Sequence, residues 1–452
     1  MIVRGKHLNK FEMLEYFESM NCLVEFDLAT FVEPKKLQKC LKDSFILCKC
    51  KYPYLRMKFS ANGQAIVEQN SQEFDLVNLE CVELAHKNAL SEEKTQERFN
   101  HFGSLPANLQ QTVFHAKLYS FQQKNFQLLI SINHACCDGI GACAVFKDLF
   151  SFLDKLLSGI DAKQVQVKSK KFFDPFKSAD YSSIDLNQIA SESSQLNKYQ
   201  NYVKNLSLSV EKPLSEFSRF CLSFRLTEHE TQHLCLKCKI NKTTVQGVLS
   251  VAVMLSLINE SRSLDETSFR VLNGSAINMR YSLDQEASSE DLMLAVSMLY
   301  WYGEFDHGDN LWSIARQGSK KVHEMKKNRE GLKFWKKLNS GLETDYEETV
   351  VNQSSIGKIS FQEDKIKNVK FKNLNFFNTT YNNQFDQNFI AVFAYTFLNR
   401  FTITFSHTCS RLSYDWSHNF TKNIEIVLKF MSNEILDDRL TVEYLLGKLI
   451  KN

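Results

Sequence analysis

The chain has 452 residues, more than one ordinary hydrophobic core accommodates, so we expect two or three domains. Hydrophobic residues make up 43% and charged residues 24%, which is typical of globular proteins, and the formal net charge of +3 gives no reason to expect a nucleic-acid or charged-membrane partner. No apolar run approaches the roughly 20 residues that span a bilayer, and no apolar segment of a secretory signal follows the first ten residues. We therefore expect a cytoplasmic protein without a transmembrane segment, whose twelve cysteines are reduced thiols.

The N-terminal third of the sequence predicts several strands around one helix. That helix begins at Pro34, because proline is well tolerated in the first turn of a helix. An Asn62-Gly63 pair is typical of a two-residue hairpin turn. Alternation and apolar runs predict strands at residues 21–28, 55–59, 64–68, 113–121 and 126–132.

The stretch FQLLISINHACCDG, residues 126–139, holds the sharpest candidate for chemistry. A helical pattern follows it, so His134, Asp138 and Gly139 lie at a strand-to-helix junction, where a rigid base positions side chains. A histidine there is suited to act as a general base near neutral pH. The alternative is a buried histidine that serves only the structure.

Cys136 and Cys137 lie beside this histidine and open a second alternative. A cysteine and a histidine can form a nucleophilic pair. A free cysteine is more commonly a small buried hydrophobic residue, however, and we favour that interpretation.

The rest of the chain predicts a linker and a second half with a similar order of elements. Residues 158–215 are polar, and we expect a linker there with one polar helix near 188–205. Beyond it we expect a strand at 220–226, a polar helix to about 239, an apolar helix from Thr243 or Thr244 to 258, a strand within 269–280, one long helix at 310–338, a hairpin at 389–405 that turns at Asn399-Arg400, and two final helices.

Two further motifs carry weaker hypotheses. His229-Glu230-Thr231-Gln232-His233 matches the H-E-x-x-H pattern of zinc proteases, and Cys235 and Cys238 could add thiolates. The helix is polar and lacks a third ligand at a known spacing, so we favour an exposed helix and expect no metal. The lysine run from 320 to 337 is typical of a solvated helix face, with recognition of a phosphorylated ligand such as coenzyme A as the alternative.

NHACCDG, residues 133–139, resembles the H-x-x-x-D-G motif of the coenzyme A-dependent acyltransferase superfamily. That superfamily includes chloramphenicol acetyltransferase, alcohol acetyltransferases and the condensation domains of peptide synthetases. Further segments are similar to family segments in the same order, so the likeness covers almost the whole chain: KYPYLR at 51–56, TTVQGVLSVAVMLSL at 243–257, NGSAINMR at 273–280, the loop SSIGKI at 354–359 and FTITFSHTCSRLSYD at 401–415.

The resemblance implies an α/β (α+β) fold of two chloramphenicol acetyltransferase-like lobes. Each lobe would be a mixed sheet flanked by helices, with an active-site tunnel between them. We expect the N-terminal lobe in residues 1–175, a linker in 176–215 and the C-terminal lobe in 216–452. Because one chain supplies both lobes, we expect a monomer.

The resemblance also implies roles for individual residues. His134 would be the general base, and Asp138 would be structural and paired with Arg280. Gly139 would permit the tight turn and place its N–H near the oxyanion. No metal and no permanently bound cofactor is implied, and acyl-CoA would be a co-substrate. Candidate contacts to the tunnel or the substrate are Asn133, Asn278, Ser354, Ser355 and Gly357.

Departures from the family pattern narrow the expected function. Condensation domains usually carry two adjacent histidines, and Asn133 replaces the first. The D-F-G-W-G loop of plant-type members is also absent. We therefore expect acyl transfer from acyl-CoA to a small alcohol or amine, as in the alcohol acetyltransferase-like branch. The alternatives are a stand-alone condensation-type domain that uses a carrier-protein thioester, and a non-catalytic binding module of the same fold.

Overall fold

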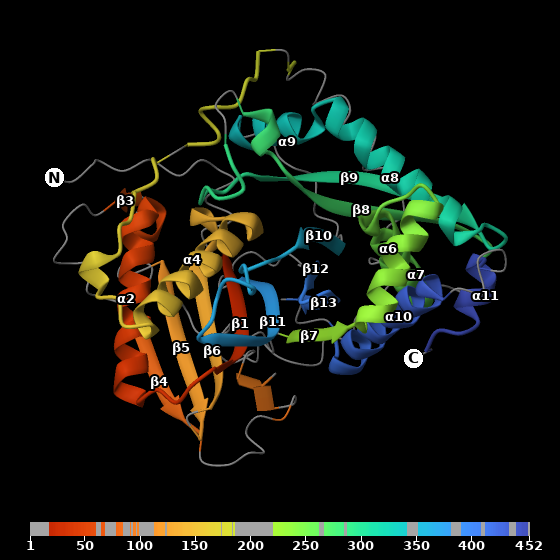
Figure 1. Ribbon diagram of the computed structural model, residues 1–452. Coiled ribbons are helices and arrows are strands. Elements are labelled where there is room, and N and C mark those ends of the chain that lie inside the picture. The colour runs from red at the N-terminus through yellow and green to blue at the C-terminus, as the bar shows by residue number, and fades with distance from the viewer. Residues whose placement is uncertain are drawn as a thin grey trace. The chain divides into compact units, whose positions relative to one another are not determined.

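The structure is a computed structural model of the chain (Figure 1). Its chain divides into two compact units: unit 1 comprises Met1–Asp180, Arg280–Ala295 and Ile359–Asn382, and unit 2 comprises Tyr181–Met279, Val296–Lys358 and Asn383–Asn452. The structure describes residues 18–59, 65–67, 78–84, 91, 94–95, 97–98, 113–122, 124–172, 174–182, 184–185, 220–261, 266–283, 287–340, 351–380, 390–407, 412–433 and 440–450.

Unit 1 is built on a five-stranded sheet in the order β11-β1-β6-β5-β4. β1 pairs antiparallel with both β11 and β6, and β4 runs parallel to β5, so the sheet is mixed. A separate antiparallel pair is formed by β2 (Met57–Phe59) and β3 (Ala65–Val67). The five strands of the sheet are β1 (Glu18–Leu28), β4 (Asn78–Glu83), β5 (Phe114–Phe121), β6 (Asn125–Asn133) and β11 (Val369–Thr380).

Two helices, α2 (Pro34–Lys51) and α4 (Gly139–Leu157), pack beside each other against this sheet (Figure 1). Aromatic side chains make the contacts: Phe45 of α2 lies 4.9 Å from Phe114 of β5, and Phe150 of α4 lies 5.6 Å from Phe26 of β1. Burial of such large side chains is what stabilises a helix on a sheet. Short 3-10 turns, η1 (Pro53–Arg56) and η5 (Ala162–Gln164), follow the two helices.

Unit 2 is built on a six-stranded mixed sheet in the order β7-β13-β12-β10-β8-β9. β10 runs parallel to β12 and β8, and the other neighbours are antiparallel. Its strands are β7 (Phe220–Arg225), β8 (Ser268–Asn278), β9 (Val296–Asp306), β10 (Val351–Lys358), β12 (Ile390–Phe397) and β13 (Arg400–His407).

The core of unit 2 lies between this sheet and its helices. α7 has buried side chains along its length, including Val248 and Met254, because it packs against α10, α8 and the sheet. Gly303 of β9 lets α7 approach closely, since a Cβ there would lie 2.3 Å from the Met254 sulfur. The helices of unit 2 are α6 (Glu228–Ile240), α7 (Val245–Ser261), α8 (Leu311–Lys327), α9 (Glu330–Asn339), α10 (Tyr414–Ser432) and α11 (Val442–Leu446).

The predicted fold class is confirmed, because the chain has two mixed sheets flanked by helices. The predicted strand at 21–28, the helix from Pro34, the hairpin β5–β6, the hairpin β12–β13 and the two final helices are also confirmed. The hairpin β12–β13 turns one residue earlier than predicted, at Leu398 and Asn399, which both have positive φ (47° and 59°).

Two predictions are wrong. The long helix at 310–338 is two helices, because α8 ends at Lys327 and Arg329 has a left-handed φ of 59°. The segment SSIGKI is no loop, since Ser354, Ser355 and Gly357 lie in strand β10. The predicted polar helix at 188–205 and the Asn62-Gly63 turn lie outside the described residues.

In the part of the chain that the structure describes, no single helix is both long and apolar enough to cross a membrane. α6 and the first sixteen residues of α7 satisfy that test of length and composition only as a pair, and they are bent by 104° at the break between them.

Candidate active site

His134 begins the 3-10 turn η4 (His134–Cys136) directly after strand β6. The side chain of Asn133 ends the strand, because its Oδ1 accepts a hydrogen bond from the Ala135 N–H at 3.1 Å. Such a local side-chain bond competes with the continuation of a strand. The turn closes with a 3.1 Å bond from the Cys137 N–H to the His134 carbonyl.

The hydrogen bond of the His134 ring fixes which nitrogen carries the proton. Nδ1 lies 2.8 Å from the carbonyl oxygen of Cys137. A carbonyl oxygen can only accept, so Nδ1 donates its proton, and in the neutral ring the lone pair lies on Nε2. The residue is 8% exposed. His134 therefore has the tautomer and the fixed orientation that a general base requires.

Asp138 and Arg280 form a buried, bidentate ion pair within unit 1. Nη1 of Arg280 donates to Oδ2 at 2.6 Å, and Nη2 donates to Oδ1 at 3.1 Å. The side chains are only 6% exposed for Asp138 and 3% for Arg280. Two parallel charge-assisted bonds of this kind are strong and fix the relative orientation of the partners.

The Asp138 carboxylate accepts two further hydrogen bonds from the backbone. The Gly141 N–H donates to Oδ1 at 2.8 Å, which caps α4, and the Ala295 N–H donates to Oδ2 at 3.0 Å. With four donors around it, the carboxylate has its acceptor sites occupied. Asp138 is therefore placed to hold the junction together rather than to exchange a proton with a substrate.

Residues 288–295 contact both partners of this ion pair. Arg280 donates from Nε to the Ser288 carbonyl at 3.1 Å and from Nη2 to the Asp291 carbonyl at 3.0 Å. The Asp138 N–H in turn donates to the Met293 carbonyl at 3.0 Å. The segment thus binds both partners of the pair through its backbone.

Gly141 and Asp291 complete the junction and were missed by the sequence analysis. A Cβ at Gly141 would lie 3.2 Å from Cδ1 of Leu292, so glycine lets residues 287–295 approach α4. Asp291 accepts from the N–H and hydroxyl of Ser288 at 2.8 and 2.9 Å and from Lys170 at 3.0 Å. The signal for Asp291 was the Ser-x-x-Asp spacing, which resembles that of a capping box.

The cysteines beside His134 are buried. Cys136 and Cys137 are both 0% exposed. Burial raises the pKa of the Cys137 thiol, and the neighbouring Cys136 and Asp138 raise that pKa further. Because the thiolate is the nucleophilic form, this environment disfavours a catalytic cysteine.

The other predicted contact residues lie in unit 2. Asn278 is exposed at the end of β8. In β10 the register is irregular between Ser355 and Gly357, where Gly357 has a φ of 87° that favours glycine. Ser354 is half-buried, and Ser355 and Gly357 are exposed. Their contact with a substrate, like the tunnel between lobes, stays a prediction.

The H-E-x-x-H motif starts helix α6. Glu230 forms a capping box, in which its Oε2 accepts from the Thr227 N–H at 2.7 Å and its N–H donates to the Thr227 hydroxyl at 3.1 Å. The rings of His229 and His233 lie 3.9 Å apart. Among the described residues, no three or more histidine, cysteine, aspartate or glutamate side chains come together as metal ligands do.

The model of the condensation-domain family matches residues 18–268. The chain belongs to the condensation-domain family. This match spans more than half of the chain and contains His134, Asp138 and Gly139, whereas Arg280 lies just beyond it. It confirms the resemblance stated above, because condensation domains are members of the acyltransferase superfamily. A comparison with curated proteins found no match.

Solved structures show the same fold at low sequence identity. The trichothecene 15-O-acetyltransferase from Fusarium sporotrichioides is 13% identical, with a TM-score of 0.69 and 96% of each chain covered. The epimerization domain from the third module of tyrocidine synthetase B is 14% identical, with a TM-score of 0.67 and coverage of 98% of this chain and 99% of that one. The first condensation domain of the calcium-dependent antibiotic synthetase is 11% identical, with a TM-score of 0.62 and coverage of 95% and 94%.

These three proteins share the condensation-domain fold but carry names of different reactions. One is an acetyltransferase, one an epimerization domain and one a condensation domain. The fold therefore leaves the reaction of this condensation-domain chain to be argued from its site.

Proposed function

We propose that this condensation-domain chain transfers an acyl group from acyl-CoA to an alcohol or amine, with His134 as the general base. The observation that carries the proposal is the 2.8 Å bond between His134 Nδ1 and the Cys137 carbonyl. It leaves the lone pair of the neutral ring on Nε2, where a base needs it.

The proposed reaction balances without a bound cofactor. Nε2 takes the proton of the acceptor O–H or N–H while the acceptor atom attacks the thioester carbonyl carbon. The tetrahedral intermediate then collapses, the C–S bond breaks, and the proton on Nε2 passes to the leaving thiolate to give free coenzyme A. Such a general base typically contributes about 10²- to 10⁴-fold in rate.

The residues after His134 support this chemistry by position. Gly139 is the first residue of α4, so its N–H has no acceptor within the helix and lies at the positive end of the helix dipole. We assign this N–H to the oxyanion of the intermediate, where a single donor can contribute about 3–4 kcal/mol. Asp138 and Arg280 hold the turn that carries both groups.

The second candidate function uses the same histidine with a carrier-protein thioester as the donor. The condensation-domain family and the similarity to the first condensation domain of the calcium-dependent antibiotic synthetase favour it. The replacement of the usual first histidine by Asn133 favours acyl-CoA. The third candidate is a binding module without turnover.

A substrate screen with a matched pair of variants separates the three candidates. The chain is incubated with acyl-CoAs of increasing length and a panel of alcohols and amines, and the acylated product is identified by mass. Because the twelve cysteines of the chain also react with thiol reagents, release of coenzyme A is measured as the difference from a reaction without acceptor. The same acceptors are then offered with a carrier-protein thioester.

We expect product with acyl-CoA and a loss of about 10²- to 10⁴-fold in His134→Ala. His323→Ala, at an exposed position of α8, is the matched control and should keep full activity. Unchanged turnover in His134→Ala would refute the general base. Product only with the carrier-protein thioester would establish the second candidate, and no product with either donor from folded protein would favour the binding module.

A further inference from the structure

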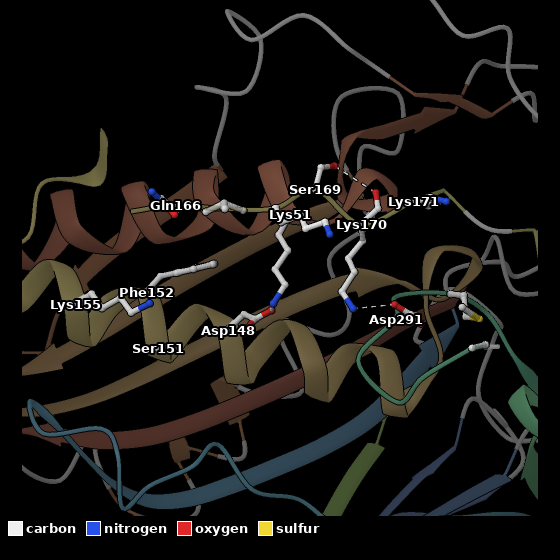
Figure 2. A pocket seen from close by; sticks show the side chains of 14 residues that line it. Lys51, Asp148, Ser151, Phe152, Lys155, Gln166, Ser169, Lys170, Lys171 and Asp291 are labelled. Carbon is white, nitrogen blue, oxygen red and sulfur yellow. Dashed lines mark hydrogen bonds and ion pairs between the residues drawn. The ribbon is translucent and has the colours of Figure 1, made fainter. Parts of the chain in front are cut away.

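A cavity of about 750 Å³ lies in unit 1 on the side of α4 and the end of α2 (Figure 2). The extended segment 166–171 and residues 287–293 complete its wall. Five of the fourteen described residues that line it are lysines: Lys51, Lys155, Lys168, Lys170 and Lys171. We call this cavity the lysine pocket.

The lysine pocket concentrates positive charge. Among the described lining residues, five lysines face two aspartates, Asp148 and Asp291, so their summed formal charge is +3, the same as that of all 452 residues. Opposite charges are thus roughly balanced over the rest of the chain and unbalanced here. A hollow with charge of one sign raises the local concentration of ions of the other sign.

Only two of the five lysines are neutralised in the part of the chain that the structure describes. Figure 2 shows Lys51 pointing at Asp148 and Lys170 pointing at Asp291, with Nζ–O distances of 2.6 and 3.0 Å. Lys155, Lys168 and Lys171 are exposed and have no carboxylate among the described residues within ion-pair distance. Three cationic groups from two separate elements therefore lie at one space, and no described carboxylate is paired with any of them.

The wall that carries these lysines is held in place. The Lys170 N–H donates to the Lys51 carbonyl at 2.7 Å, which ties segment 166–171 to the end of α2. Phe172, just beyond, stacks on Tyr54 at 4.3 Å. Asp148 also accepts from the Tyr52 hydroxyl. The pocket is thus formed before any ligand arrives, which lowers the entropic cost of binding.

Size and lining define the class of ligand. A volume of about 750 Å³ is that of a small-molecule site. Lysines act as point charges suited to phosphate, and none of the described lining residues is an arginine, whose fork suits planar carboxylates. Phe152, the one aromatic side chain among the described lining residues, is buried and offers no stacking platform for nucleic-acid bases. We propose that the lysine pocket binds a small molecule with clustered phosphate groups, at a site that does not contain His134.

The lysine pocket shares a wall with the Asp138–Arg280 pair. Asp291 and Met293 line the pocket, and their carbonyl groups accept hydrogen bonds from Arg280 and from the Asp138 N–H. A phosphate bound to Lys170 competes with Asp291 for that lysine. Occupancy of the pocket should therefore raise the melting temperature of the protein as well as give a binding signal.

The test is calorimetric titration of the full chain with sodium pyrophosphate at low ionic strength, with adenosine 3′,5′-bisphosphate, succinate and an acidic peptide as further arms. Lys168→Gln/Lys171→Gln removes two charges from segment 166–171, and Lys155→Gln removes one from α4. The control Lys321→Gln/Lys327→Gln removes two exposed charges from α8 in unit 2. Melting curves establish that each variant is folded.

We expect pyrophosphate to bind, and its affinity to fall as salt is added. The variant Lys168→Gln/Lys171→Gln should bind pyrophosphate at least about tenfold more weakly than the parent, which corresponds to about 1.4 kcal/mol. The α8 control should bind like the parent. Tighter binding of the bisphosphate than of pyrophosphate supports the proposal with a nucleotide as the source of the phosphates, and equal binding supports it with a free polyphosphate. No pyrophosphate binding, equal loss in the control, or tighter binding of succinate or the acidic peptide overturns the proposal.

Discussion

Replacement of Asp138 by asparagine tests whether the buried ion pair holds unit 1 together. The substitution keeps the size of the side chain and keeps an oxygen that can cap α4 at Gly141. It removes the negative charge opposite Arg280, whose side chain is 3% exposed. With the remaining oxygen on Gly141, the new NH₂ group takes the place of Oδ2 and faces both Arg280 Nη1 and the Ala295 N–H, which are themselves donors.

The expected loss of stability is large. Removal of one partner leaves an uncompensated buried cation, which typically costs about 3–5 kcal/mol. For a unit of about 220 residues, each kcal/mol lowers the melting temperature by roughly 2–4 °C, so we expect a decrease of roughly 6–20 °C. Asp138→Asn/Arg280→Met removes both charges and should be less destabilised than the sum of the single variants by about 0.5–3 kcal/mol.

The assay is thermal unfolding of the full chain, with an exposed ion pair of the same unit as the control. Lys94 and Glu97 lie 2.8 Å apart with side chains 52% and 54% exposed, so Glu97→Gln should cost about 1 kcal/mol or less. If Asp138→Asn melts within the range of Glu97→Gln, the pair does not stabilise unit 1 and the reasoning is refuted. An additive double variant would show instead that the two charges act independently.

Two further outcomes concern pH and metal. Burial lowers the pKa of His115 from 6.5 to about 4, so between these pH values the unfolded chain binds a proton that the folded chain does not. In that range unit 1 should lose up to about 1.4 kcal/mol of stability for each pH unit of acidification. His115→Gln should flatten the pH dependence of the urea midpoint, and an unchanged slope would contradict this. Glu230→Ala should destabilise unit 2 by about 1 kcal/mol, because it removes the capping box at the start of α6. A chelator should leave the melting temperature of the parent protein unchanged, and a decrease on chelation would instead support a metal at the H-E-x-x-H motif.

Short sequence patterns correctly predicted those helices and hairpins whose ends are set by residues adjacent in the sequence. The helix at Pro34 and the hairpin β5–β6 are of this kind. The long helix at 310–338 failed because apolar spacing continues across its break. Tertiary contacts decide the break, since Trp335 of α9 is fully buried and donates to the Val296 carbonyl at 2.8 Å. A periodicity reports a buried face and not the direction of the next helix.

Side chains of the candidate site could be predicted from the sequence, whereas the backbone groups that position them could not. His134, Asp138 and Gly139 follow from a short motif, and Arg280, 142 residues beyond Asp138, follows only from the family resemblance. The carbonyl groups of Ser288, Asp291 and Met293 that enclose the pair have no sequence signature, because every residue has a carbonyl group. Nothing in the sequence predicted that β11 pairs with β1.

Later parts of the chain complete unit 1 and stabilise the junction that holds His134 and Asp138. β11 pairs with β1 from Glu18 to Leu28, so it covers an edge that would otherwise be open, and residues 280–295 supply Arg280. The Cys137 carbonyl that orients His134 directly precedes the peptide N–H of Asp138, which is bound to Met293. The bond from the Asp138 N–H to the Met293 carbonyl therefore holds the peptide whose carbonyl group sets the tautomer of His134. It follows that variants of Arg280 should lose activity even at temperatures where they remain folded, because the orientation of the imidazole is lost before the unit unfolds.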